Sequence, residues 1–140
     1  MHHLLDRLCR EELSILIVHG DKELYRSALP GVRPLLDIWL RFPEGLTGAT
    51  IADRVVGGCA ARIFAHLKAA RVLALTGSVS ARAILAAAGI GFEVKHGVLA
   101  IRNRNGTDTC PFEQLSRHYL RAEELVPAIH TRLDQLRPAR

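Results

Sequence analysis

The chain has 140 residues, 49% of them hydrophobic, which predicts one domain with an ordinary buried core. Its apolar runs are far shorter than the roughly 20 residues of a membrane-spanning helix, and its charged N-terminal segment has no small-residue cleavage site, so we expect a cytoplasmic protein without a membrane partner. The net charge of +5 is spread along the chain, which favours a solvated basic surface over a nucleic-acid interface. The three cysteines form no C-x-x-C pair and are expected to be free thiols.

The N-terminal part is expected to form a helix, a hairpin and a second helix. Leucines in the first ten residues recur at the spacing of an amphipathic helix. Residues 14–19 and 23–27 are typical of two strands joined by a two-residue turn. Pro34 suits the first turn of a helix that runs to about residue 41.

The middle of the chain has the clearest alternation of elements. Residues 49–56 and 71–75 are predicted to be buried strands, and residues 59–68 and 79–88 are predicted to be the helices that follow them. Residues 76–78 are predicted to form a turn between the second strand and its helix. This order implies a parallel strand pair joined by a right-handed crossover.

The C-terminal part has a weaker pattern. Residues 92–95 and 98–101 are predicted to be two short strands, and residues 103–109, which are dense in turn formers, are predicted to be a loop. Pro111 begins a predicted helix that ends near residue 120, and a last amphipathic helix spans about residues 122–137.

Two parts of the sequence resemble a known family. They are residues 31–35 with 51–57 (GVRPL and IADRVVG), and residues 103–113 (NRNGTDTCPFE). They resemble an uncharacterised bacterial and archaeal domain family of the cytidine-deaminase-like superfamily, over roughly residues 12–120. The resemblance implies an α/β fold of three layers (α/β/α), with a mixed sheet opened by an N-terminal hairpin and helices on both faces. The C-terminal helix would follow this core within a single domain.

The chain nevertheless lacks the residues of a zinc deaminase. Such enzymes need a His or Cys followed two residues later by Glu, and a P-C-x-x-C pair, each at a helix start. No histidine here has a Glu two residues on, and the only C-x-E, at Cys9, precedes the first predicted strand. We therefore expect no metal site and no cofactor. Gly58 stands where a lysine is common in the family, which puts in doubt any role of a cation at that position.

Cys110 is the first candidate for chemistry. It precedes Pro111, so it is predicted to be the N-cap of the next helix, with Glu113 three residues on in a capping-box pattern. Amide dipoles at a helix N-terminus favour a thiolate, whereas Asp108 and Glu113 oppose it. Cys110 is therefore either a structural cap or a reactive, ligand-contacting thiol.

Asp53 is the second candidate, because it lies toward the carboxyl end of a predicted parallel strand, where open α/β sheets bind ligands. Its alternative role is a turn carboxylate. Polar and glycine residues from the neighbouring loops are candidates for ligand binding, although turn and capping roles explain each of them as well. They are Gly57, Gly58, Thr76, Ser78, Ser80, Asn103, Asn105, Gly106, Thr107 and Asp108. Among them, Ser78 is predicted to be the N-cap of the helix that follows it, and the backbone amides after Gly57 are candidates for holding an anion.

These residues support two main hypotheses. The first is a metal-independent domain that binds a nucleotide- or nucleoside-like small molecule between Asp53, Ser78 and residues 103–110. The superfamily's usual ligands imply the nucleobase part of this hypothesis. The second is an enzyme that uses Cys110 as a nucleophile or redox thiol, with Asp53 or Glu113 as the proton carrier.

A third hypothesis is a nucleic-acid or protein interaction module. It would use the basic surface, including Arg132, Arg137 and Arg140 of the last helix. The sequence leaves the oligomeric state open, and a homo-oligomer is compatible with all three hypotheses.

Overall fold

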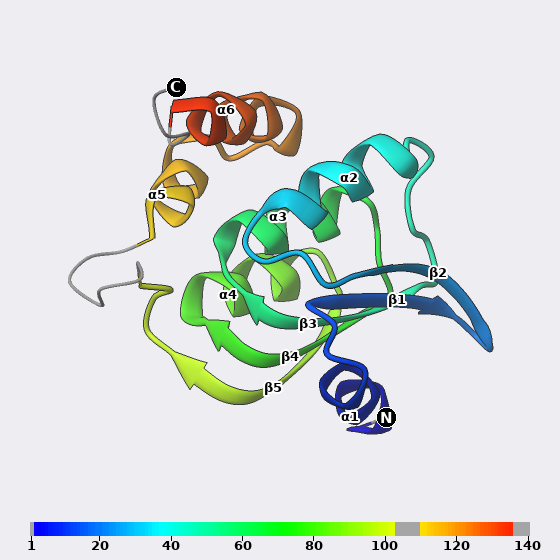
Figure 1. The fold of residues 1–140 in the computed structure, drawn as a ribbon. Helices are drawn as coiled ribbons and strands as arrows, with labels where there is room; N and C mark the ends of the chain where they lie inside the picture. Colours follow the sequence, from blue (N-terminus) through cyan, green and yellow to red (C-terminus); the bar gives the residue numbers. More distant parts are fainter. Residues whose placement is uncertain (1, 103–109, 136–140) are drawn as a thin grey trace.

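The computed structural model describes residues 2–102 and 110–135, and its centre is a five-stranded mixed sheet (Figure 1). The strands lie in the order β2-β1-β3-β4-β5. They are β1 (Ile15–His19), β2 (Lys22–Ser27), β3 (Thr50–Val56), β4 (Arg71–Ser78) and β5 (Gly91–Val98). β1 is antiparallel to both β2 and β3, whereas β3, β4 and β5 are parallel. The hairpin and the parallel pair predicted from the sequence are confirmed.

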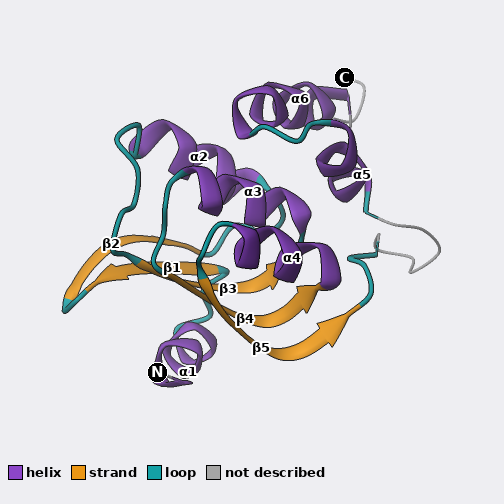
Figure 2. Cartoon of the chain, turned by 180° about the vertical axis from the view of Figure 1, so that it is seen from behind, coloured by secondary structure: helices purple, strands orange, loops and turns teal. Residues whose placement is uncertain are grey.

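Helices lie on both faces of the sheet, as the predicted α/β class requires. They are α1 (His2–Arg10), α2 (Arg33–Arg41), α3 (Gly58–His66), α4 (Val79–Ala87), α5 (Pro111–His118) and α6 (Ala122–Gln135). Within the described part of the chain, α1 covers one face, and α2 to α6 lie on the opposite side (Figures 1 and 2). None of the described helices is long and apolar enough to be a transmembrane span.

Alternating side chains along the strands divide the core between these two faces. Ile15 and Ile17 of β1 belong to the large cluster under the helices, whereas Leu16 belongs to a smaller cluster with the α1 leucines Leu5 and Leu8. The period of two along a strand produces this separation. Both clusters include fully buried residues of β3 and β4, which explains why these central strands are nearly continuous apolar runs.

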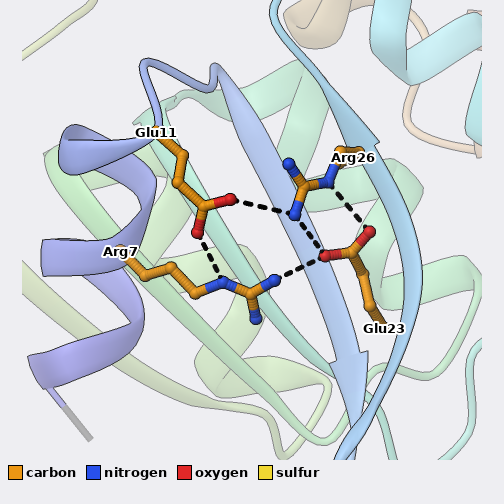
Figure 3. Close-up of polar contacts among 4 residues, drawn as sticks. All are labelled: Arg7, Glu11, Glu23 and Arg26. Atoms are coloured by element: carbon orange, nitrogen blue, oxygen red, sulfur yellow. Dashed lines mark hydrogen bonds and ion pairs between the residues drawn. The ribbon is translucent and has the colours of Figure 1, made fainter.

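Four charged side chains join α1 to the hairpin (Figure 3). Arg7 donates to Glu11 and to Glu23 with nitrogen–oxygen distances of 2.7 and 2.6 Å. Arg26 contacts the same two carboxylates at 3.0 and 2.7 Å. Hydrogen bonds from Arg7 to Glu11 and from Arg26 to Glu23 lower the pKa of each carboxyl group. The network therefore holds α1 against the sheet in its charged form, with a contribution that salt screens because the groups are exposed.

Two sequence predictions about strand ends are wrong. Residues 76–78 are not a turn, because β4 runs to Ser78 and passes directly into α4. Nor are there two short strands around Gly97, which lies inside β5 and pairs with Gly77. The reason lies in the tertiary structure. Thr76 and Gly77 pair with both β3 and β5, and Ser78 pairs with β5, so the ladder hydrogen bonds override the local preference of Thr, Gly and Ser for turns.

Candidate functional site

The first turn of α3 is capped by a carboxylate from a distant part of the chain. The Glu113 carboxylate accepts hydrogen bonds from the backbone N–H groups of Gly58 at 2.6 Å and Cys59 at 3.3 Å. Glu113 belongs to α5 and is only 8% exposed. The N-cap of α3, Gly57, has no side chain to offer, so Glu113 supplies the acceptor that the free amides need and places a negative charge at the positive end of the helix.

Gly57 and Gly58 leave the space that this contact occupies. A Cβ atom on Gly57 would collide with the Glu113 carboxylate, and one on Gly58 would collide with the Ser116 hydroxyl. The backbone of Gly57, with φ −106° and ψ −166°, is extended and open to any residue. The two glycines are therefore required for close approach of α5 rather than for an unusual backbone conformation.

Further hydrogen bonds complete the contact between α3 and α5, which we call the α3–α5 junction (residues 57–62 with 112–120). The Cys59 thiol donates to the Phe112 carbonyl at 2.7 Å, and the Arg62 Nε donates to the Ser116 carbonyl at 2.8 Å. Burial raises the pKa of the Cys59 thiol, and the nearby Glu113 carboxylate adds to the effect. The junction is thus a hydrogen-bonded contact that encloses a buried thiol whose neutral form is favoured.

The structure corrects the predicted capping box. Cys110 is the N-cap of α5, as predicted, but its side chain makes no capping hydrogen bond. Glu113 does not return to its own helix start and bonds to α3 instead. The amides of α3 proposed to hold an anion therefore hold the chain's own carboxylate, and an external anion would have to displace it. Cys110 is half-buried, and its thiol stays a candidate.

Asp53, the second candidate from the sequence, is not linked by hydrogen bonds to Cys110 or Glu113 within the described residues. It is a half-buried residue of β3 that pairs with Ile15 and Ala74. Burial raises the pKa of Asp53 to about 7, against the opposing effect of hydrogen bonds from the backbone of Val55 and Arg54. Within residues 2–102 and 110–135, no hydrogen bond or ion pair joins Asp53 to Cys110 or Glu113.

A shallow pocket of about 220 Å³ lies at the carboxyl ends of β4 and β5, beside the start of α4. Its walls are Gly77, Ser78, Val79, Arg82, Gly97, Val98 and Leu99. Ser78 is the predicted N-cap of α4, and its hydroxyl accepts a hydrogen bond from the Ala81 N–H at 3.1 Å. This is the sheet edge at which the sequence placed its ligand crevice.

The other predicted ligand residues fall around or outside this pocket. Thr76 is half-buried within β4, and Ser80 is exposed on α4, but neither lines the pocket. The loop residues Asn103, Asn105, Gly106, Thr107 and Asp108 lie outside the described residues. In the part of the chain that is described, no three His, Cys, Asp or Glu side chains are grouped so as to hold a metal ion.

Sequence reasoning missed Arg82, which supplies the positive charge of the pocket. Its guanidinium carbon lies 5.6 Å from the centroid of the Phe92 ring, at the distance of a cation–π contact. The signal was available, because Arg82 follows the predicted cap Ser78 by four residues and so lies on the same face of α4.

Comparisons with known proteins agree with the fold. A family model described as TM1506, domain of unknown function (DUF1893), matches residues 3–133. The crystal structure of a DUF1893 family protein, TM1506 from Thermotoga maritima, has a TM-score of 0.83 and 24% sequence identity to this chain. The match covers 94% of this chain and 88% of that chain, and at this identity it shows the fold alone. No curated protein matches the chain.

Proposed function

The chain belongs to the DUF1893 family, and from the pocket beside α4 we propose that it binds a small anionic molecule of the nucleotide or nucleoside class. The observation that carries this proposal is the joining of a cation, a helix N-terminus and apolar walls in one pocket at the carboxyl edge of the parallel strands. Open α/β sheets commonly bind ligands at this edge.

Each part of the pocket suits a different part of such a ligand. Arg82 and the free amides at the start of α4 would hold a phosphate, since both attract anions and the guanidinium offers paired donors. Val79 and Leu99 are 58% and 83% exposed, and they offer apolar surface for a planar base. At Gly97 a Cβ would have no atom within 4 Å, so the backbone there is open to a ligand.

The nucleoside part of the proposal draws on the sequence resemblance to the cytidine-deaminase-like superfamily. The missing zinc-ligand motifs argue against deamination itself, so the proposal is for binding. Asp53, whose pKa is raised to about 7, lies in the middle of β3 and does not line this pocket, so the binding proposal assigns it no role.

Thermal-shift measurements with nucleosides, nucleotides and inorganic phosphate test the proposal. A ligand at about 100 times its Kd would stabilise the fold by about 2.7 kcal/mol. Arg82→Gln is expected to weaken binding of a phosphate-bearing ligand about ten-fold, because it removes a charge-assisted hydrogen bond. Arg10→Gln, an exposed change on α1, is the matched control and should leave binding unchanged. Lack of stabilisation by every compound, or equal binding by Arg82→Gln, would refute the site.

Cys110 supports a second candidate function, an enzyme with a nucleophilic thiol. The observation in its favour is that the half-buried Cys110 thiol is not used as a helix cap. Glu113 is a poor proton carrier for it, because its carboxylate is already bonded to two amides of α3.

Alkylation with iodoacetamide, followed by mass spectrometry, tests the second candidate. Cys59 is expected to stay unmodified in the folded protein, because it is buried and its pKa is raised. Exposed Cys9 is the internal reference for an ordinary thiol. A nucleophilic Cys110 should react about ten-fold faster than Cys9, and an equal or slower rate would contradict this role.

A further inference from the structure

The outer edge of β5 is an open strand. β5 is the last strand in the sheet order, and no described residue pairs with its outer side. Its eight residues contain no proline, and its register with β4 shows no shift. Figures 1 and 2 show it at the margin of the sheet, below α4. A long regular edge strand of this kind is a template for pairing with another chain.

The geometry points to a homodimer in which β5 pairs antiparallel with β5 of a second copy, with Val94 on the two-fold axis. Residues opposite each other across such a pair point to the same face of the sheet. Centring the axis at Val94 places Glu93 opposite Lys95 of the second copy, twice. The result is one continuous sheet across the two copies. This inference is independent of the ligand proposed above.

The charges of Glu93 and Lys95 favour a two-fold axis at Val94 over one at Lys95. The Oε1 atom of Glu93 bonds to Arg71 at 2.8 Å, and its Oε2 atom is buried without a hydrogen-bond partner among the described residues. The Glu93 side chain as a whole is 44% exposed, so its carboxylate would turn outward to meet Lys95 of the second copy. Among the described residues, the ion pair of Lys95 is a long contact with Asp6, at 3.9 Å. Pairing Glu93 with Lys95 joins opposite charges on the same face, whereas an axis at Lys95 would place two lysines opposite each other.

Helix α4 leaves room for the second copy. Arg82 lies over the Phe92 ring, so its side of α4 faces β5, and Ala86 lies one turn further on the same side. Ser78, just before α4, pairs with Val98 of β5. From there the nine residues of α4 run back along the sheet for about 13 Å, which is the length of about four strand residues. The C-terminal half of α4 therefore lies level with Val94. The exposed residues there are small: Ala83, Ala86 and Ala87.

The same register also gives a partner to an exposed apolar side chain beside the pocket. Leu99 is 83% exposed and follows directly after β5. Continuing the antiparallel pairing places it opposite Gly89 of the second copy, in the turn between α4 and β5. The second copy would therefore cover Leu99 and border the pocket described above.

Sedimentation velocity of the full chain over a wide concentration range tests the dimer. The natural chain should be a dimer, and Lys95→Glu and Glu93→Lys should each raise the dimer dissociation constant at least about ten-fold by placing like charges opposite each other. The double change Glu93→Lys with Lys95→Glu should restore the dimer. Lys22→Glu makes the same charge change on β2, at the other edge of the sheet, and should have no effect. A monomeric natural chain, or a double variant no better than the single ones, overturns the proposal.

Two further pairs of variants test the interface in a folded protein. Ala86→Arg adds bulk to an exposed helix position, so it should yield a folded monomer, whereas Ala28→Arg on the exposed loop after β2 should stay dimeric. Val94→Cys tests the axis in a chain that lacks Cys9 and Cys110, because Cβ atoms opposite each other lie about 5 Å apart. It should crosslink on oxidation, and Val98→Cys on the same strand should not. Ala86→Arg dimers, or equal crosslinking at both positions, would reject this interface.

Discussion

Gly57→Ala is expected to lower the free energy of unfolding by about 2–4 kcal/mol, which is a large effect for one methyl group. The added Cβ would collide with the Glu113 carboxylate, and the neighbours cannot yield easily because that carboxylate is bonded to the Gly58 and Cys59 amides. Urea denaturation monitored by circular dichroism measures the change. Gly97→Ala is the matched control, because no atom lies within 4 Å of its added Cβ, and it should be close to neutral.

A double-mutant cycle with Glu113 shows whether the collision is the cause. Glu113→Ala alone should cost about 2–3 kcal/mol, since it leaves buried amides at the start of α3 without an acceptor. It also removes the group that the alanine at position 57 would strike. The double variant should therefore be more stable than the sum of the single effects predicts, by about 1–2 kcal/mol. Additive effects would mean that Gly57 does not serve the contact with Glu113.

The long periodic segments of the fold could be predicted from the sequence. The leucine spacing in α1 and the alternation of apolar strands with amphipathic helices from β3 to α4 are local signals, and tertiary packing agrees with them. The end of β4 could not be predicted in the same way. Thr76, Gly77 and Ser78 favour a turn locally, and it is their pairing with β5, joined by β3 at Thr76 and Gly77, that makes them part of a strand.

The role of Glu113 shows a second limit of sequence reasoning. A carboxylate three residues after an N-cap predicts a capping box at the start of its own helix, here α5. In the folded chain the start of α3 also lies within reach of Glu113, and the carboxylate bonds there instead. One signal was present. The start of α3 has neither a Ser, Thr, Asp or Asn cap nor an acidic residue in its first turn, so its amides need an acceptor from outside the helix.

Asp53→Asn is expected to stabilise the protein above about pH 7 and to have little effect near pH 4. The folded-state pKa of Asp53, about 7, is higher than its ordinary value of 3.8, so the folded state binds the proton more tightly than the unfolded state does. Stability from this group is therefore complete below about pH 4, falls as the pH rises toward about 7, and stays low above it. A shift of about three pKa units corresponds to at most about 4 kcal/mol, and partial exposure reduces our expectation to about 1–3 kcal/mol.

The pH profile of the difference between the two proteins is the decisive measurement, because other titrating groups affect both equally. Asp21→Asn, on the exposed hairpin turn, is the control and should give a small difference that does not vary with pH. A constant difference for Asp53→Asn would mean that its carboxylate titrates normally and would remove the reason to consider it as a proton carrier. A difference that grows between about pH 4 and 7 would establish a carboxyl group in the middle of β3 that is half-protonated near neutral pH, which is the condition that acid–base chemistry by Asp53 requires.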